Sequence, residues 1–298
     1  MNLKKYLDER RRLVDRSLKQ MLGAGGSFPR TIDKAMRYSL FSGGKRIRPI
    51  LALASGEAVG GSLDRVMPFA CALEMIHSYS LVHDDLPAMD DDDLRRGKPT
   101  NHVVFGEGMA ILAGDGLLTE AFRVMAEGAL HAGQDRSAAL RAIREIAAGA
   151  GAAGMVGGQV ADLESEKKKP TRLLVEYIHS RKTGALLRAS VRAGAWVGGA
   201  KPGQFARLDR YGVAVGFAFQ VADDILDIEG GTEKTGKREG RDAERQKVTY
   251  PAAVGMDNAK KKARELLAES LDALSSFGPA ADPLRQIATF IVERAVQP

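Results

Sequence analysis

Apolar residues recur at intervals of three and four positions along most of the chain, and this spacing places them on one face of an α-helix. The pattern is clearest over residues 64–82, whose predicted inner face carries small or apolar side chains: Val66, Phe69, Ala70, Leu73, Ile76 and Ser80. The same spacing predicts helices over residues 110–131, 137–162, 173–196, 205–228, 258–274 and 282–296. Alternating segments rich in β-branched residues, which would indicate strands, are almost absent. The sequence therefore predicts an all-α protein of roughly ten or more helices.

Clusters of glycine and proline separate these segments, but no linker is long or distinct enough to divide the chain. We therefore expect residues 1–298 to form one domain. Residues 147–158 read AAGAGAAGMVGG, and each interior glycine costs a helix about 1 kcal/mol relative to alanine. Because helical patterns flank this segment on both sides, we expect a helix rather than a loop. Its small side chains would let two backbones approach closely.

Composition and charge exclude several classes of protein. Of the 298 residues, 44% are hydrophobic and 28% charged, as in ordinary globular proteins, and the single cysteine, Cys71, cannot form an intrachain disulfide. The excess of 44 basic over 38 acidic residues is modest. The basic clusters are not interleaved with aromatic residues, as they would be on a nucleic-acid-binding surface. No apolar run is long enough to span a membrane, and the charged first twenty residues do not read as a signal peptide, so a cytoplasmic location is expected.

Six aspartates fall within ten residues directly after the first apolar helix, in the sequence HDDLPAMDDDDLRRGKPTN from His83 to Asn101. Acidic runs are usually solvated, but this one follows an apolar helix, where solubility does not require it. Like charges 4 Å apart repel by about 4 kcal/mol at an effective dielectric constant of 20, so the cluster is typical of a cation site. Pro87 ends the helix, and we expect the resulting turn to bring Asp84 and Asp90 together.

A second acidic cluster, DDILD at 223–227, again ends an apolar helix. Its first and last aspartates are four residues apart and lie on one helix face, together with Gln220 and Phe217. Sites made only of oxygen ligands suit Mg²⁺, which often bridges to substrate phosphates. Arg95 and Arg96 follow the first cluster, and guanidinium groups bind phosphate oxygens in pairs. The two clusters therefore predict a Mg²⁺ site for a phosphorylated ligand.

These two motifs resemble the first and second aspartate-rich motifs of the trans-isoprenyl diphosphate synthases. The resemblance covers the chain from about Thr31 to its end and extends through SGGKRIRP, EMIHSYSL, GMVGGQVADL, HSRKTGALL, EKTGKREGRD and TYPA. It is closest to the bacterial short-chain subgroup, the farnesyl diphosphate synthases (geranyltranstransferases), whose first motif has two extra residues; Pro87 and Ala88 supply them here. The resemblance implies a helical bundle of the isoprenoid-synthase type around a deep central cavity, and a homodimer.

The resemblance also implies a set of residue roles. Three Mg²⁺ ions would bridge the allylic diphosphate; Asp84 and Asp90 would ligate two of them and Asp223 the third, while Asp85, Asp224 and Asp227 would act indirectly or through water. The same diphosphate would be held by Arg95, Lys182, Thr183, Gln220 and Lys237. The diphosphate of isopentenyl diphosphate would be held by Lys45, Arg48, His77 and Arg96, with Gly44 letting the backbone approach. Gln159 and Asp162 would face the cavity.

The product length depends, under this resemblance, on the residues just before Asp84. Ser80 is small and leaves room for the growing chain, whereas the bulky Tyr79 would form the floor of the cavity. Helical geometry alone is equally compatible with Tyr79 as a packed core residue. Within the family an aromatic residue there accompanies a fifteen-carbon product. The expected reaction therefore joins isopentenyl diphosphate to dimethylallyl and geranyl diphosphate, giving (2E,6E)-farnesyl diphosphate, with geranylgeranyl diphosphate as the alternative product.

Two other classes remain as alternatives. A terpene cyclase or a head-to-head squalene-type synthase also uses aspartate-rich Mg²⁺ sites, but neither needs a second anion site such as the predicted basic set. A non-catalytic subunit of a heteromeric synthase would not need both aspartate motifs and both basic sets. Product analysis with isopentenyl diphosphate separates these classes.

Overall fold

The structure is a computed structural model and describes residues 1–23, 25, 29–131, 133–165, 169–229 and 249–296. Its helices in the first half of the chain are α1 (Leu3–Met21), α2 (Arg30–Leu40), α3 (Ile47–Ala58), α4 (Leu63–Asp84), α5 (Asn101–Phe105), α6 (Glu107–Leu130) and α7 (Arg136–Ala150). Those of the second half are α8 (Met155–Ser165), α9 (Arg172–Ile178), the π-helix η1 (His179–Gly184), α10 (Ala185–Val197), α11 (Pro202–Glu229), α14 (Tyr250–Val254), α15 (Met256–Ala273), the 3₁₀-helix η2 (Pro279–Ala281) and α16 (Asp282–Val296). The all-α prediction is confirmed.

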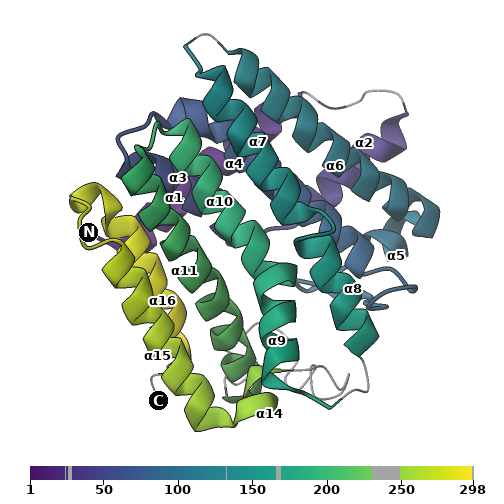
Figure 1. Ribbon diagram of the computed structural model, residues 1–298. Coiled ribbons are helices and arrows are strands. Elements are labelled where there is room, and N and C mark those ends of the chain that lie inside the picture. The colour runs from purple at the N-terminus through teal and green to yellow at the C-terminus, as the bar shows by residue number, and fades with distance from the viewer. Residues whose placement is uncertain (24, 26–28, 132, 166–168, 230–248, 297–298) are drawn as a thin grey trace.

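The helices pack around two clusters of buried apolar side chains. One cluster surrounds α11, which packs against α10, α15 and α16, and the other surrounds α4, which packs against α3 and α6. Figure 1 shows α11 and α10 running alongside each other, with α15 and α16 on the outer side of α11 and α7 beyond α10. Residues such as Phe69 and Leu73 of α4 are fully buried, and burying each such side chain contributes about 1.5–3 kcal/mol. The two aspartate clusters lie at the ends of these two core helices.

The helix predicted over residues 137–162 is wrong in one respect, because it is two helices, α7 and α8, separated by a turn at residues 151–154. The glycines are the reason: a Cβ atom on Gly154 would overlap the carbonyl oxygen of Gly149, so this turn needs residues without side chains. The predicted close approach of backbones is confirmed. A Cβ atom on Gly149 would lie only 2.8 Å from that of Ala189 in α10.

Very little of the described chain is extended. Two short strands, β1 (Leu94–Arg95) and β2 (Lys98–Pro99), pair antiparallel and form a hairpin just after the first aspartate cluster. Arg96, at the turn of this hairpin, adopts a positive φ of 54°. The hairpin therefore holds the two arginines of the first motif in a fixed turn rather than in a loose acidic loop.

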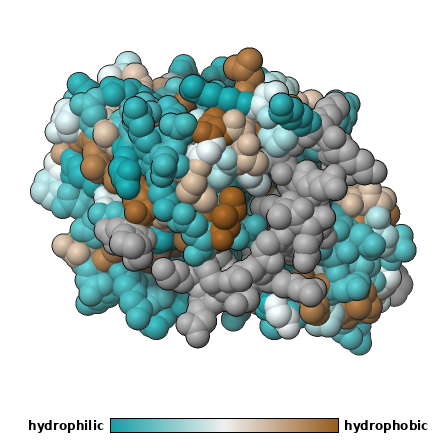
Figure 2. Space-filling model, turned by 90° about the horizontal axis from the view of Figure 1, so that it is seen from below, coloured by the Kyte–Doolittle hydropathy of each residue, from teal (hydrophilic) through white to brown (hydrophobic). Residues whose placement is uncertain are grey.

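Figure 2 views the molecule from the end at which α11 finishes, and the described residues on this face are mostly hydrophilic, with scattered hydrophobic positions. No helix in the described ranges is long and apolar enough to cross a membrane.

Candidate active site

The first aspartate cluster folds back on the end of α4. The backbone N–H of Asp90 donates to the carbonyl of Asp84 at 2.8 Å, and that of Asp92 donates to the carbonyl of Asp85 at 3.1 Å. Asp91 takes a positive φ of 49°, which reverses the chain direction. The expectation that Pro87 ends the helix and that the turn brings Asp84 and Asp90 together is confirmed.

The carboxyl group of Asp84 is electrostatically strained. Burial raises its pKa from 3.8 to about 6, and the neighbouring carboxylates of Asp90 and Asp85 add to the rise, while Lys182 and Arg95 oppose it. A buried carboxylate with other carboxylates close by favours a cation in its surroundings. Its ligand atoms are hard oxygens, which suit Mg²⁺. The first cluster therefore fits a divalent cation.

No group of three or more carboxylate, imidazole or thiol side chains converges to hold a metal ion by itself anywhere in the described ranges. This is compatible with Mg²⁺, which commonly binds through one or two carboxylates and keeps waters or substrate phosphate oxygens as its other ligands. A Mg²⁺ site here would be completed by the ligand and not by protein side chains alone.

Asp85, which is buried, and Arg95, which is partly exposed, form an ion pair beside this cluster. Arg95 Nε lies 2.8 Å and 2.9 Å from the two carboxylate oxygens of Asp85, and Arg95 Nη2 lies 2.6 Å from Oδ1. Asp85 is only 3% exposed. Its carboxylate therefore orients the guanidinium group of Arg95, which agrees with an indirect role for Asp85.

Lys182 lies between several carboxylates. Its Nζ atom is 2.5 Å from Asp162 Oδ2. Burial by itself would lower the pKa of this ammonium group, but Asp162 and, more weakly, Asp84 and Asp90 raise it, so Lys182 stays charged. Sequence analysis placed Asp162 at the cavity without giving it a partner, and the structure supplies one.

The π-helix η1 sets the position of Lys182 and Thr183. Such wide turns are rare and often occur at functional sites. Gly158 of α8 packs directly on this turn, and a Cβ atom there would overlap the backbone nitrogen of Lys182 and lie 2.6 Å from its Cα. The glycine-rich segment predicted to allow close approach therefore supports the turn that carries Lys182.

The second aspartate cluster is divided between buried and accessible side chains. Asp224 is 6% exposed, accepts a hydrogen bond from the backbone N–H of Tyr250 at 2.6 Å, and lies 3.3 Å from His179 Nε2. Asp223 and Asp227 are partly exposed. Asp223 Oδ1 lies 3.9 Å from Arg294 Nη2 of α16. Asp224 thus links η1, α11 and α14, while the other two carboxylates remain accessible.

Three residues of this cluster's surroundings were missed by sequence reasoning. His179 and Tyr250 stand inside the segments HSRKTGALL and TYPA, but nothing in those segments indicated that both would contact Asp224. Arg294 carried no signal at all, because its partner Asp223 is seventy-one positions away in the sequence.

A basic pocket forms where the loop before α3 meets the β1–β2 hairpin. Arg96 Nη1 donates to the carbonyl of Gly43, and a Cβ atom on Gly44 would lie 2.7 Å from that same nitrogen. Gly44 also has a φ of 125°, so glycine is required there for both reasons. The group that approaches Gly44 here is Arg96, and the expected approach of the backbone to a diphosphate stays a prediction.

The pKa values in this pocket reflect its crowded positive charge. Burial lowers the pKa of His77 well below its usual value, and the charges of Arg48 and Arg96 lower it further, so the imidazole is neutral. Burial likewise lowers the pKa of Arg48 to about 10. The buried Nε of Arg48 makes no hydrogen bond with any described residue. Arg48, His77 and Arg96 therefore lie close enough for their charges to act on one another, and Lys45 is exposed.

For the remaining predicted residues that lie in the described ranges, the structure gives exposure and local contacts. Tyr79 is 8% exposed and packs edge-on against His83, with ring centroids 5.8 Å apart. The hydroxyl of Ser80 donates to the carbonyl of His77 at 2.9 Å. Gln220 is partly exposed on α11, while Gln159 Oε1 is buried and has no partner among the described residues. Lys237 lies outside the described residues.

Known proteins share both the sequence and the fold. Residues 29–277 match the polyprenyl synthetase family. A farnesyl diphosphate synthase of Geobacillus stearothermophilus is 50% identical over 265 residues, covering 88% of each chain, and a geranylgeranyl diphosphate synthase of Cyanophora paradoxa is 47% identical, covering 98% of this chain and 97% of its own. The crystal structure of a geranyltransferase from Legionella pneumophila aligns with a TM-score of 0.87 at 32% identity, covering 98% of both chains. The two relatives are named for different products.

Proposed function

The chain belongs to the polyprenyl synthetase family and is a trans-prenyltransferase, and we propose that it makes (2E,6E)-farnesyl diphosphate from isopentenyl, dimethylallyl and geranyl diphosphate. One observation carries this proposal. An acidic site with its own cation, Lys182, stands beside a separate basic pocket of Arg48, His77 and Arg96. Two anion-binding sites suit two diphosphate substrates, whereas a terpene cyclase or a squalene-type synthase has no need of an isopentenyl diphosphate site.

In this proposal the allylic diphosphate binds at the acidic site. Asp84, Asp90 and Asp223 would hold Mg²⁺, which supplies positive charge to a departing diphosphate. Lys182 and Arg95 would stabilise the same group as its charge develops, and such preorganised electrostatic stabilisation is usually the largest contribution to catalysis. Asp162 and Asp85 would keep these two cations in place, since each already forms a short ion pair with one of them.

Isopentenyl diphosphate would occupy the basic pocket. Arg48 and Arg96 would bind its diphosphate through charged N–H donors, and the neutral imidazole of His77 would donate one hydrogen bond. This would hold the double bond of isopentenyl diphosphate near the allylic carbon, and the departing diphosphate would accept the proton that the product loses. The described motifs offer no other evident base for that step.

The activity is tested directly by incubating the purified protein with isopentenyl and dimethylallyl diphosphate and Mg²⁺, then separating the products. We expect chains of fifteen carbons and no turnover after chelation of divalent metal. Cyclic hydrocarbons, or a failure to incorporate isopentenyl diphosphate, would contradict the proposal.

Product length is expected to depend on Tyr79. If its ring closes the cavity, Tyr79→Ala should shift the main product from fifteen to twenty or more carbons, because the chain then extends past the missing ring. Chromatographic sizing of the products measures this. Tyr79→Phe, which keeps the ring, should leave the product unchanged. An unchanged product from Tyr79→Ala would assign Tyr79 to the core alone. A twenty-carbon product from the unaltered protein would favour geranylgeranyl diphosphate.

The proposal includes a homodimer, as the family resemblance implies. Exposed apolar side chains gather on α5 and α6, namely Val103, Val104, Ile111, Leu112 and Phe122. Sedimentation equilibrium should give about twice the chain mass of 32.0 kDa. Leu112→Glu should yield a monomer, because it buries an unpaired charge in the interface. Leu140→Glu, at an exposed position on α7, is the control; dissociation by both variants or by neither would contradict this interface.

A further inference from the structure

Arg46 lies between two of the predicted diphosphate ligands but is turned away from them. Its side chain is buried, with 2% exposed, in the loop that joins α2 to α3. Its φ of 53° is in the left-handed region, which is unfavourable for a residue with a side chain. The structure therefore holds Arg46 in an unfavourable backbone conformation by other contacts.

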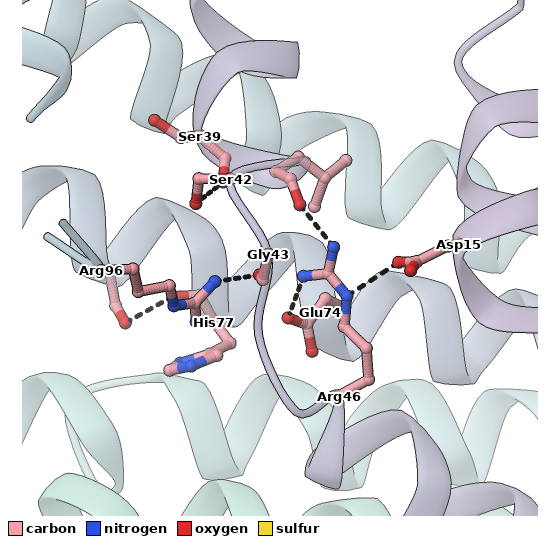
Figure 3. A network of polar contacts seen from close by, with 10 residues as sticks. Asp15, Ser39, Ser42, Gly43, Arg46, Glu74, His77 and Arg96 are labelled. Atoms are coloured by element: carbon pink, nitrogen blue, oxygen red, sulfur yellow. Dashed lines mark hydrogen bonds and ion pairs between the residues drawn. The ribbon is translucent and has the colours of Figure 1, made fainter. Parts of the chain in front are cut away.

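Those contacts come from three different helices. Arg46 Nη1 donates to Glu74 Oε1 of α4 at 2.6 Å, and Nε donates to Asp15 Oδ1 of α1 at 2.9 Å. Arg46 Nη2 donates to the carbonyl of Leu40, the last residue of α2, at 2.7 Å. Figure 3 shows these hydrogen bonds around the single guanidinium group of Arg46. All three nitrogen atoms of the side chain are used, so its position is fully determined.

The loop separates this network from the basic pocket. In Figure 3, Arg46 and Glu74 lie on one side of the loop at Gly43, and Arg96 and His77 lie on the other. His77 follows Glu74 by three residues on α4, and Arg48 follows Arg46 by two in the chain. Fixing Arg46 thus fixes the backbone from which Lys45 and Arg48 project.

The positive charge of Arg46 also balances the negative charge of the buried Glu74 carboxylate. The Glu74 side chain is only 3% exposed. Its charge acts on Arg48 and Arg96, whose pKa values it raises against the lowering effect of burial. Without Arg46, Glu74 would be a buried carboxylate whose charge still acts on Arg48 and Arg96. It would then compete with a substrate diphosphate for them.

We propose that Arg46 is a positioning residue for isopentenyl diphosphate: it anchors the junction between the loop that carries Lys45 and the start of α3, which carries Arg48, and it binds the Glu74 carboxylate so that Arg48 and Arg96 stay available. This inference rests on the proposed function. It assigns to Arg46 no contact with the substrate. It concerns only one of the two substrates, because the hydrogen bonds of the Arg46 side chain go to Asp15, Glu74 and Leu40 and to none of the residues proposed to hold the allylic diphosphate.

The test is a comparison of the Michaelis constants of both substrates. Arg46→Gln should raise the KM for isopentenyl diphosphate by about tenfold or more, with the KM for dimethylallyl diphosphate changed by less than about twofold. The double variant Arg46→Gln/Glu74→Gln should recover part of this loss, because it removes the competing carboxylate. Arg46→Lys, which keeps the charge but not the three-way contact, should be intermediate and guards against a failure of Arg46→Gln to fold.

Arg10→Gln provides a matched control. Arg10 of α1 pairs with Glu57 of α3 at 2.5 Å, so it also ties these parts of the protein together, but it lies outside the pocket. This variant should lower the thermal midpoint of unfolding. It should not raise the KM for isopentenyl diphosphate relative to the KM for dimethylallyl diphosphate. If Arg46→Gln and Arg46→Lys change both KM values alike or neither, or if the double variant is no better than Arg46→Gln, Arg46 is merely structural. If the unaltered protein does not incorporate isopentenyl diphosphate, the proposed function itself fails.

Discussion

Replacing Asp84 with asparagine is expected to reduce kcat by about 10²–10³-fold and, at the same time, to make the substrate-free protein more stable at neutral pH. The loss of turnover follows from removing a proposed Mg²⁺ ligand. The gain in stability follows from the raised pKa of this carboxyl group, about 6 against an ordinary 3.8. Such a shift corresponds to about 1–3 kcal/mol of unfavourable free energy in the charged state, or about 2–8 °C in the thermal midpoint.

The direction of the pH effect is fixed by linkage. Because the folded state binds the proton of Asp84 more tightly than the unfolded state, stability from this group is present at low pH. It is lost as the pH rises through the range from about 4 to 6. The free energy of unfolding, measured without metal, should therefore fall less between pH 4.5 and 7.5 in Asp84→Asn than in the unaltered protein.

Asp93→Asn is the control for this experiment, because Asp93 belongs to the same acidic run but is exposed. It should change neither kcat nor the thermal midpoint appreciably. An Asp84→Asn variant that keeps near-normal turnover, or that loses stability at pH 7.5, would remove Asp84 from the proposed metal site.

Lys182→Ala is expected to lower kcat by about 10²–10³-fold, since it removes a charged donor from the departing diphosphate. It should also raise the pKa of Asp84 further, because Lys182 is the largest influence opposing that rise. The variant should therefore need more Mg²⁺ than the unaltered protein at pH 6. Steady-state rates across a range of Mg²⁺ concentrations measure both effects.

The neighbouring Arg181 supplies a matched control. Its guanidinium group lies over the ring of Tyr177, 4.0 Å from the centroid, and away from the carboxylates that surround Lys182. Arg181→Ala should keep kcat within about twofold. Equal losses in both variants would mean that the π-helix, and not the ammonium group, is what the reaction needs.

The sequence predicted most of the helices because their apolar residues recur at helical spacing. In α4 burial extends beyond one face, since every residue from Phe69 to Ile76 is buried. It predicted the convergence of Asp84 and Asp90 for a local reason, the proline that ends α4. It did not predict the break at residues 151–154, because the same small residues suit a tight turn and a closely packed helix. Only the packing decides between them, since a Cβ atom on Gly154 would overlap the carbonyl oxygen of Gly149.

The contacts that position the site were beyond sequence reasoning because they join distant segments. Tyr250 and Asp224 are twenty-six residues apart, and Arg46 and Glu74 twenty-eight. The motifs assigned Asp224 and Lys45 to the predicted substrate sites. They gave no reason to expect that His179 or Arg46 would position those sites. A charged side chain that positions another charged side chain produces no periodic pattern in the sequence. Such a residue is therefore recognised only when the packing of the helices is known.

Both aspartate clusters are proposed to bind metal around one diphosphate. This proposal is tested most directly by a crystal structure with Mn²⁺ in place of Mg²⁺, isopentenyl diphosphate and an unreactive dimethylallyl thiolodiphosphate. We expect anomalous scattering peaks beside Asp84, Asp90 and Asp223, all contacting the diphosphate of the allylic analogue. Metal-free carboxylates, with Asp84 and Asp223 facing solvent and the analogue bound elsewhere, would contradict the account.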